Sequence, residues 1–217
     1  MSRLQISLGC RCDVAWQLRR AFGETAAYPF DWLVTPLSGV VGLLRNRFAD
    51  LVNQKYLEVV RYNAGWTVMN TRYQVFLHHE FKRSPGGMIA EDWRNDVENV
   101  SEKYRFISQR FFDALKKEKN IVFYRRGGEF DMPGEMDLPT SAKTVLELYE
   151  VLSFHSRSNP TLVMLNCAET PTSKGIIKES VAAPSVEDTP ERADYWKGSA
   201  AQYDTMFARL GVLAGAR

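Results

Sequence analysis

The chain opens with apolar residues at alternate positions, and the spacing then changes to that of a helix. Leu4, Ile6 and Leu8 alternate as in a short buried strand, and Gly9 interrupts the pattern. From Asp13 onward, apolar residues share one helical face: Val14, Ala15, Leu18 and Phe22. The sequence therefore predicts a strand, a glycine turn and a helix that begins near Cys12.

The next part of the chain predicts one helix and then extended segments. Thr35 and Pro36 resemble a helix start, with Thr35 as the cap and Pro36 at the first helical position. Residues 56–62, 66–69 and 73–77 are rich in strand-forming side chains and are separated by turn residues. We expect these three segments to form an antiparallel insertion.

The second half alternates helices and strands. Apolar residues at steps of three or four predict a long helix over 91–117. Continuous apolar runs at 121–124 and 161–165 predict buried parallel strands, and residues 141–154, capped by Thr140, predict the helix between them. Residues 176–181 predict one more strand, at an edge of the sheet.

These elements predict an α/β fold: a single three-layer domain over residues 1–217, with a mainly parallel central sheet and an antiparallel strand insertion. The segment 184–191 is rich in proline and charge, so we expect the part after about residue 184 to be peripheral, closed by a helix over 200–213.

Composition narrows the class of protein without naming a function. The chain has 217 residues, 45% of them hydrophobic, enough for one sizeable core. A net charge of +2 gives no reason to expect a nucleic acid or membrane partner. No signal peptide and no apolar run of membrane-spanning length is evident. Three cysteines without framework spacing favour reduced thiols and a cytoplasmic location.

Cys12 is the strongest candidate for chemistry. The positive end of a helix favours a thiolate over a thiol, and it also binds anions. The alternative is a packing role, because free cysteines are often buried. Cys10, Cys12 and Cys167 do not give the paired spacing of a zinc site. With no Walker loop and no glycine-rich dinucleotide turn either, we predict no metal and no cofactor.

Two further groups could contribute to a site. His78, His79 and Glu80 follow the last extended segment, and a histidine there can act as a general base. The strand alternation does not decide which histidine faces a cavity. The loop 82–87 beside them could be a flap or a connector. Trp32 could form a site wall with Asp31 beneath it. The alternative is a loop or short strand that Phe30 and Trp32 anchor in the core, with Asp31 capping or pairing nearby.

Polar residues also follow both predicted parallel strands. Arg125 and Arg126 lie where sites gather in open α/β sheets, so they could hold an anionic substrate. They could equally pair with the acidic stretch 129–137. Asn166 ends the next strand.

Several motifs carry a family resemblance. There are three, in chain order: Ser7-Leu8-Gly9-x-x-Cys12 with its helix, Pro29-Phe30-Asp31-Trp32, and His79-Glu80-Phe81. Together they resemble a bacterial domain family of unknown function described as putative papain-like cysteine peptidases. The resemblance runs from about residue 4 to about residue 165. The family usually has His-Asp-Phe where this chain has His-Glu-Phe.

The resemblance implies a hydrolase or acyl transferase with a Cys–His pair. Cys12 would be the nucleophile and His79 the base, while Asp31 or Asn166 would orient the imidazole. Backbone N–H groups from Gly9 to Cys12 would stabilise an oxyanion. It also implies a papain-like α+β fold, which is the alternative to the three-layer α/β domain.

Two other functions remain open. A strand–turn–helix bearing Ser7 is also typical of SGNH-type esterases, although the chain has no Asp-x-x-His; a carbohydrate-processing hydrolase belongs to the same alternative. A non-catalytic module could bind an anion at the helix start with Arg125 and Arg126. The expected substrate is peptide-like, acyl or carbohydrate-linked and small. Besides the catalytic candidates, the residues predicted to contact it are Ser7, Gly9, Trp32, Glu80, Arg125 and Arg126.

Overall fold

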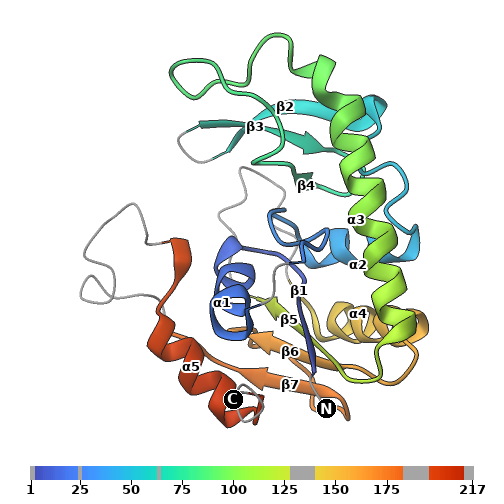
Figure 1. Ribbon diagram of the computed structural model, residues 1–217, viewed down its shortest axis with the longest axis vertical. Helices are drawn as coiled ribbons and strands as arrows, with labels where there is room; N and C mark the ends of the chain where they lie inside the picture. The colour runs from blue at the N-terminus through green and yellow to red at the C-terminus, as the bar shows by residue number, and fades with distance from the viewer. Residues whose placement is uncertain (1–2, 24–25, 63–64, 128–139, 183–195, 213–217) are drawn as a thin grey trace.

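The computed structural model describes residues 3–23, 26–62, 65–127, 140–182 and 196–212. It contains two separate sheets (Figure 1). The four-stranded sheet is parallel, in the order β1 (Leu4–Ser7), β5 (Ile121–Arg126), β6 (Thr161–Leu165) and β7 (Ile176–Glu179). The three-stranded sheet is antiparallel, in the order β2 (Leu57–Tyr62), β3 (Gly65–Asn70) and β4 (Val75–Phe76).

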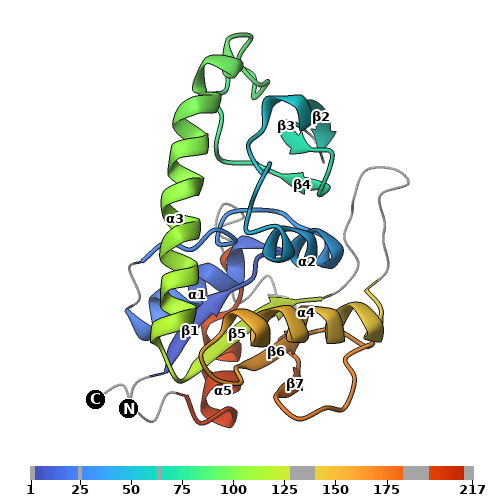
Figure 2. The ribbon, with the colours of Figure 1, turned by 90° about the vertical axis from the view of Figure 1, so that its right-hand side faces the viewer.

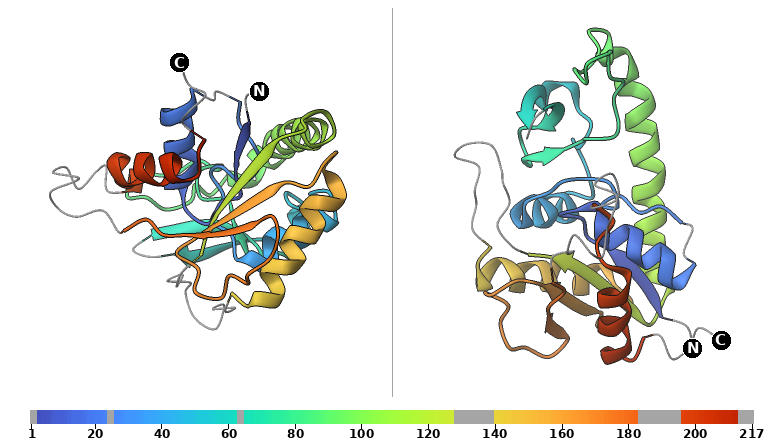
Figure 3. Two further views of the ribbon diagram at one scale, coloured as in Figure 1. Left: turned by 90° about the horizontal axis from the view of Figure 1, so that it is seen from below. Right: turned by 90° about the vertical axis from the view of Figure 1, so that its left-hand side faces the viewer.

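Helices cover both faces of the parallel sheet, which makes three layers (Figure 3). α1 (Cys12–Phe22) and α5 (Ala200–Arg209) pack on one face, over Val122 and Tyr124. The opposite face of β5, including Ile121 and Phe123, packs against the other three helices. Those helices are α2 (Leu37–Arg45), α3 (Val97–Lys117) and α4 (Ala142–His155).

The predicted α/β class is therefore confirmed, with the antiparallel strands inserted between β1 and β5. A parallel central sheet with helices on both faces is not the largely antiparallel arrangement of the papain-like alternative. The edge position of β7 is also as predicted. The three layers follow from the strands themselves, because successive side chains point to opposite faces and both faces here are apolar.

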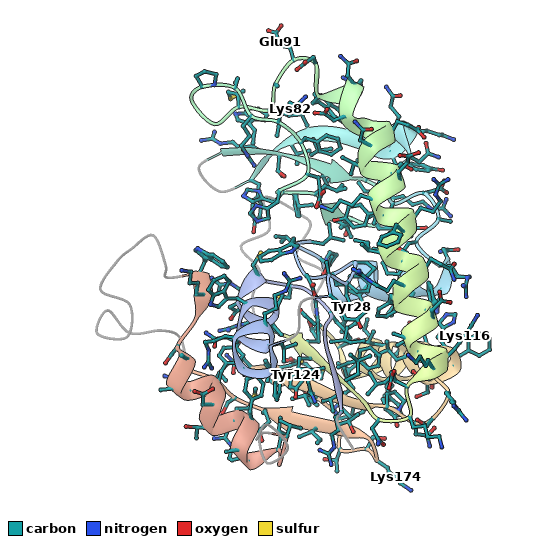
Figure 4. The ribbon with its side chains drawn as sticks, viewed as in Figure 1. Tyr28, Lys82, Glu91, Lys116, Tyr124 and Lys174 are labelled. Atoms are coloured by element: carbon teal, nitrogen blue, oxygen red, sulfur yellow. The ribbon has the colours of Figure 1, made fainter. Side chains whose placement is uncertain are left out.

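α3 joins the two sheets. It runs from the antiparallel sheet down to the parallel one, beside α2 and α4 (Figures 1 and 2). Lys82 and Glu91 lie at the end of the molecule formed by the antiparallel sheet, and Lys174 lies at the opposite end (Figure 4). The helix predicted over 91–117 begins later than expected, after a 3-10 turn at Trp93–Asp96. Another 3-10 turn, Gln54–Tyr56, precedes β2.

The capping predictions were less accurate than the elements themselves. Thr35 does not cap α2, because Pro36 holds the N-cap position and the Thr35 hydroxyl accepts a hydrogen bond from Arg125. Ser141, instead of Thr140, caps α4, and its hydroxyl accepts a 3.1 Å bond from the Thr144 N–H. In the first case a tertiary contact takes the capping hydroxyl away from its local helix.

Two predictions lie outside the described residues. The acidic stretch 129–137 and the peripheral segment 184–191 belong to parts of the chain that the structure does not describe. Among the described residues, no helix combines the length and apolar character needed to cross a membrane.

Candidate functional site

The turn between β1 and α1 has the predicted form. Gly9 has a φ of 75° and Cys10 a φ of 83°, so the chain passes through left-handed conformations before α1 begins at Cys12. A Cβ on Gly9 would lie 2.9 Å from the Phe30 carbonyl oxygen. Both the positive φ and this close approach require glycine. Cys12 therefore occupies the first position of a helix, as the sequence predicts.

His79 lies beside Cys12. The Cys12 Sγ and His79 Nε2 atoms are 3.8 Å apart, although the two residues are separated by 67 positions. Cys12 belongs to the unit built on the parallel sheet, and His79 follows β4 of the antiparallel sheet. The site thus arises where the inserted strands return to the start of α1. The distance is that of a long sulfur–nitrogen hydrogen bond, of the kind that tightens when substrate binds.

The structure separates the two histidines that the strand pattern could not. His78 turns to Arg83, whose guanidinium lies 3.4 Å from His78 Nδ1 and donates a 3.1 Å bond to the His78 carbonyl. Its ring also packs on Tyr62. Burial is the main reason that the pKa of His78 is lowered to about 4, with His79 and Arg83 adding to the effect. His78 is thus held as a neutral partner of Arg83.

Aromatic contacts hold the His79 ring. Trp32 meets it edge to face at 6.1 Å between centroids, and His78 does so at 4.9 Å. Within the described part of the chain, no carboxylate or amide side chain hydrogen-bonds to His79. Trp32, predicted as a site wall, therefore lies at the imidazole itself.

Neither residue predicted to orient His79 is bonded to it. The Asp31 carboxylate accepts bonds from Arg19 at 2.8 Å and from the Tyr28 N–H at 2.9 Å, which ties the loop before α2 to α1. The Asn166 side chain bonds to both backbone groups of Val181, at 2.7 and 2.9 Å. Each side chain instead satisfies buried or strand-end backbone groups close to it.

Glu80 anchors the histidine segment to α3. Its carboxylate accepts a 2.6 Å bond from Lys103 and a 3.0 Å bond from the Tyr104 hydroxyl, and its side chain is only 3% exposed. We predicted that Glu80 contacts substrate, but its oxygens face the protein. Its negative charge acts on the neighbouring imidazole and raises the pKa of His79, against the larger lowering by desolvation.

The electrostatics of Cys12 differ from the prediction. Burial raises the pKa of the Cys12 thiol to about 11, and the negative charges of Asp13 and Asp31 add to this, while Arg11 lowers it. Desolvation of the charged form is the largest cause, and the raised pKa is opposite to the lowering expected for a cysteine at a helix start. Since the pKa of His79 is lowered, the resting pair consists of a neutral thiol and a neutral imidazole.

Arg125 and Arg126 are internal to the protein. Arg125, 2% exposed, donates to the Leu8 carbonyl at 2.9 Å and to Thr35. Arg126 pairs with Asp13, which also accepts a 3.0 Å bond from Tyr203. The predicted anion-binding role does not fit these positions, because the guanidinium groups are committed to buried acceptors. They brace the turn and the first residues of α1.

Ser7 is also committed. Its hydroxyl accepts a 3.2 Å bond from the Gly9 N–H and the residue is 2% exposed, so it closes the turn instead of facing a substrate. The Gly9 N–H is thereby removed from the predicted set of oxyanion donors. The Arg11 side chain does not cap the first turn of α1. The backbone N–H groups near Cys12 therefore remain as donors for an oxyanion.

Among the described residues, no three His, Cys, Asp or Glu side chains cluster as metal ligands. The sequence did not predict that two further tryptophans, Trp16 and Trp196, continue the aromatic contacts of Trp32. Trp196, just before α5, lies 6.5 Å from Trp32 and 5.4 Å from Trp16 between ring centroids. Trp16 follows Cys12 by one helical turn. No local pattern links Trp196 to residues some 180 positions earlier in the chain. The link is tertiary: the Gln17 side chain donates a hydrogen bond to the carbonyl of Lys197, the neighbour of Trp196.

A family described as "Putative papain-like cysteine peptidase", a domain of unknown function, matches residues 3–156. The chain belongs to this family. The matched region contains both Cys12 and His79 and ends near the end of α4. An uncharacterized protein of Acanthamoeba polyphaga mimivirus is 24% identical over 184 residues, which covers 79% of each chain. No solved structure matches.

Proposed function

We propose that this protein is a cysteine hydrolase or acyl transferase that uses Cys12 as nucleophile and His79 as general base. The single observation that supports it most is the 3.8 Å approach of Cys12 Sγ and His79 Nε2 from distant parts of the chain. A nucleophile paired with a general base is the arrangement that activates a side chain for covalent catalysis. The family description agrees with this chemistry.

The reaction begins from the neutral pair. As Sγ attacks a carbonyl carbon, His79 Nε2 takes the thiol proton and the C=O π electrons move to oxygen. The tetrahedral oxyanion receives hydrogen bonds from N–H groups near Cys12, at the positive end of α1. When the intermediate collapses, the imidazolium returns the proton to the leaving amine, alcohol or thiol, and an acyl thioester of Cys12 remains.

The second half restores the enzyme. His79 accepts a proton from water, or from an acceptor nucleophile, as that group attacks the thioester carbonyl. As this intermediate collapses, the C–S bond breaks, the Cys12 thiolate leaves, and it takes the proton back from the imidazolium. A peptide-like or acyl substrate suits this sequence. Because both groups begin neutral, the base must act during attack, as in a serine hydrolase, and not through a preformed ion pair.

The other candidate functions receive less support. An esterase that uses Ser7 would need that hydroxyl exposed, whereas it is buried and accepts from the Gly9 N–H. An anion-binding module would need donors on Arg125 or Arg126 that face solvent, and both residues are buried.

The test is acylation of Cys12 by an activated substrate. Incubation with S-phenyl thioacetate should release thiophenol and add one acetyl group to Cys12, located by peptide mass spectrometry. Cys12→Ala should abolish both, and His79→Ala should slow acylation by about 10²–10⁴-fold. His155→Gln is the matched control, since it replaces a histidine on α4 and leaves His79 and its aromatic neighbours intact. Equal losses in the two histidine variants, or acylation elsewhere with Cys12 untouched, would refute the proposal.

A further inference from the structure

A row of aromatic rings continues away from His79 on the side of α1. The contacts run from His79 to Trp32, from Trp32 to Trp196 and from Trp196 to Trp16. All are edge-to-face contacts with centroid distances between 5.4 and 6.5 Å. Trp196 is 41% exposed and Trp16 and Trp32 are half-buried, so this tryptophan wall meets solvent.

The wall is held in place by polar contacts behind it. The Gln17 amide, on α1, donates to the Lys197 carbonyl at 2.7 Å and to the Gly198 carbonyl at 3.2 Å. These bonds fix the residues after Trp196 against α1, and the ribbon shows α5 running beside α1 (Figure 3). A wall with fixed rings can bind a ligand without first ordering its own side chains.

Cations lie over the indole rings. Lys197 Nζ is 4.7 Å from the Trp16 ring centroid and 5.8 Å from that of Trp196, and the Arg19 guanidinium is 5.2 Å from that of Trp32. A sugar would need an open indole face with carboxylates or amides around it for its hydroxyl groups. Here cations already lie over the indole rings, and the nearby Asp31 carboxylate is committed to Arg19 and to the Tyr28 N–H.

These features favour an aromatic guest. Ring edges carry partial positive charge, and cations are attracted to the negative face of a ring. A flat aromatic group placed against the wall would turn its negative face toward both the indole edges and the cations. Trp32 touches the His79 ring and Trp16 lies one turn from Cys12, so the guest would sit next to the reacting sulfur.

We propose that Trp16, Trp32 and Trp196 form a subsite that binds an aromatic ring of the substrate beside Cys12. This rests on the proposed function and names its substrate class: acyl or peptide-like compounds with an aromatic group near the scissile carbonyl. Each aromatic contact contributes roughly 2- to 12-fold in affinity.

The experiment compares alkylating probes that differ only in the group they carry. Iodoacetamide, N-propyl, N-benzyl and N-glucosaminyl iodoacetamides all form a Cys12 Sγ–carbon bond with loss of iodide and a proton. Rates at Cys12 are measured by mass spectrometry at pH 9 and divided by rates with N-acetylcysteine. We expect the benzyl probe to exceed the propyl probe by about tenfold.

The variants decide the source of this preference. Trp196→Leu and Trp16→Leu should bring the benzyl-to-propyl ratio close to one, whereas Trp196→Phe should keep most of it. Phe154→Leu is the matched control, because it removes an 83% exposed ring on α4, across the sheet from α1. Circular dichroism checks that each variant folds. If Trp16→Leu does not fold, Trp196→Leu alone is sufficient for the test.

The outcomes separate this inference from the proposed function. A benzyl-to-propyl ratio near one in the native protein overturns the aromatic subsite, and a faster glucosaminyl probe overturns it in favour of a sugar. In either case thioacetate still acylates Cys12 if the Cys–His mechanism holds. Absence of that acylation refutes the mechanism itself, and a benzyl preference would then mark only a ligand site.

Discussion

The reactivity of Cys12 toward iodoacetamide should follow a thiol with a strongly raised pKa. Burial, Asp13 and Asp31 raise the pKa of Cys12 to about 11. At pH 7 such a thiol is about one part in ten thousand thiolate, compared with about 3% for an ordinary cysteine near 8.5. In the free protein, Cys12 should thus be alkylated roughly 300-fold more slowly at pH 7 than an exposed thiol.

The assay is alkylation by limiting iodoacetamide between pH 6 and 11, with peptide mapping of each cysteine. The Cys12 rate should rise about tenfold per pH unit without levelling below about pH 10, because the raised pKa keeps the thiolate scarce. Cys10 and Cys167 are each 2% exposed and should react only on unfolding. The protein in urea supplies the reference thiol.

Arg11 provides a check on the direction in which nearby charges shift the pKa of Cys12. Its positive charge lowers the pKa of Cys12, so Arg11→Gln should raise that pKa and slow alkylation by about two- to threefold, an effect that 1 M salt should remove. Arg61→Gln, at an exposed position of β2, is the matched control. A midpoint at or below about pH 8.5 in the folded protein would refute the argument, because the helix start and His79 would then outweigh burial.

Three further outcomes follow from the site. Gly9→Ala should lower the free energy of unfolding by about 3 kcal/mol in urea titrations, from the left-handed backbone and the overlap with Phe30; an unchanged midpoint would contradict this. Arg125→Met should cost about 3 kcal/mol and lower the melting temperature by roughly 6–12 °C, because buried oxygen acceptors lose their donor; a stable variant with altered anion affinity would restore the binding role. Glu80→Gln removes a charge that raises the pKa of His79, so the acid limb of activity should move to lower pH, and movement the other way would disprove that assignment.

Local pattern was sufficient for the elements and for one half of the site. The change from alternate to helical spacing around Gly9 placed Cys12 at a helix start, and continuous apolar runs gave the parallel strands. These features depend on neighbours within a few positions, which is the range over which periodicity and backbone preference act. The family motifs also singled out His79 over His78.

Tertiary packing decided which side chains meet. Asp31, Asn166 and Arg125 were predicted to serve a site because they follow strands or flank aromatics, yet each is bonded to backbone or charge brought in by folding. The polar type of a residue does not reveal its partner, since any buried donor or acceptor must find one wherever the chain passes.

Tertiary packing also decided the pKa of Cys12 and the formation of the tryptophan wall. A helix start alone predicts a lowered cysteine pKa, whereas the folded environment around Cys12 raises it by desolvation. Trp196 reaches Trp16 only because α5 packs beside α1. The sequence by itself determined the fold class and the nucleophile candidate. The approach of His79, the charge state of the pair and its aromatic surroundings depend on contacts between segments that only the folded chain brings together.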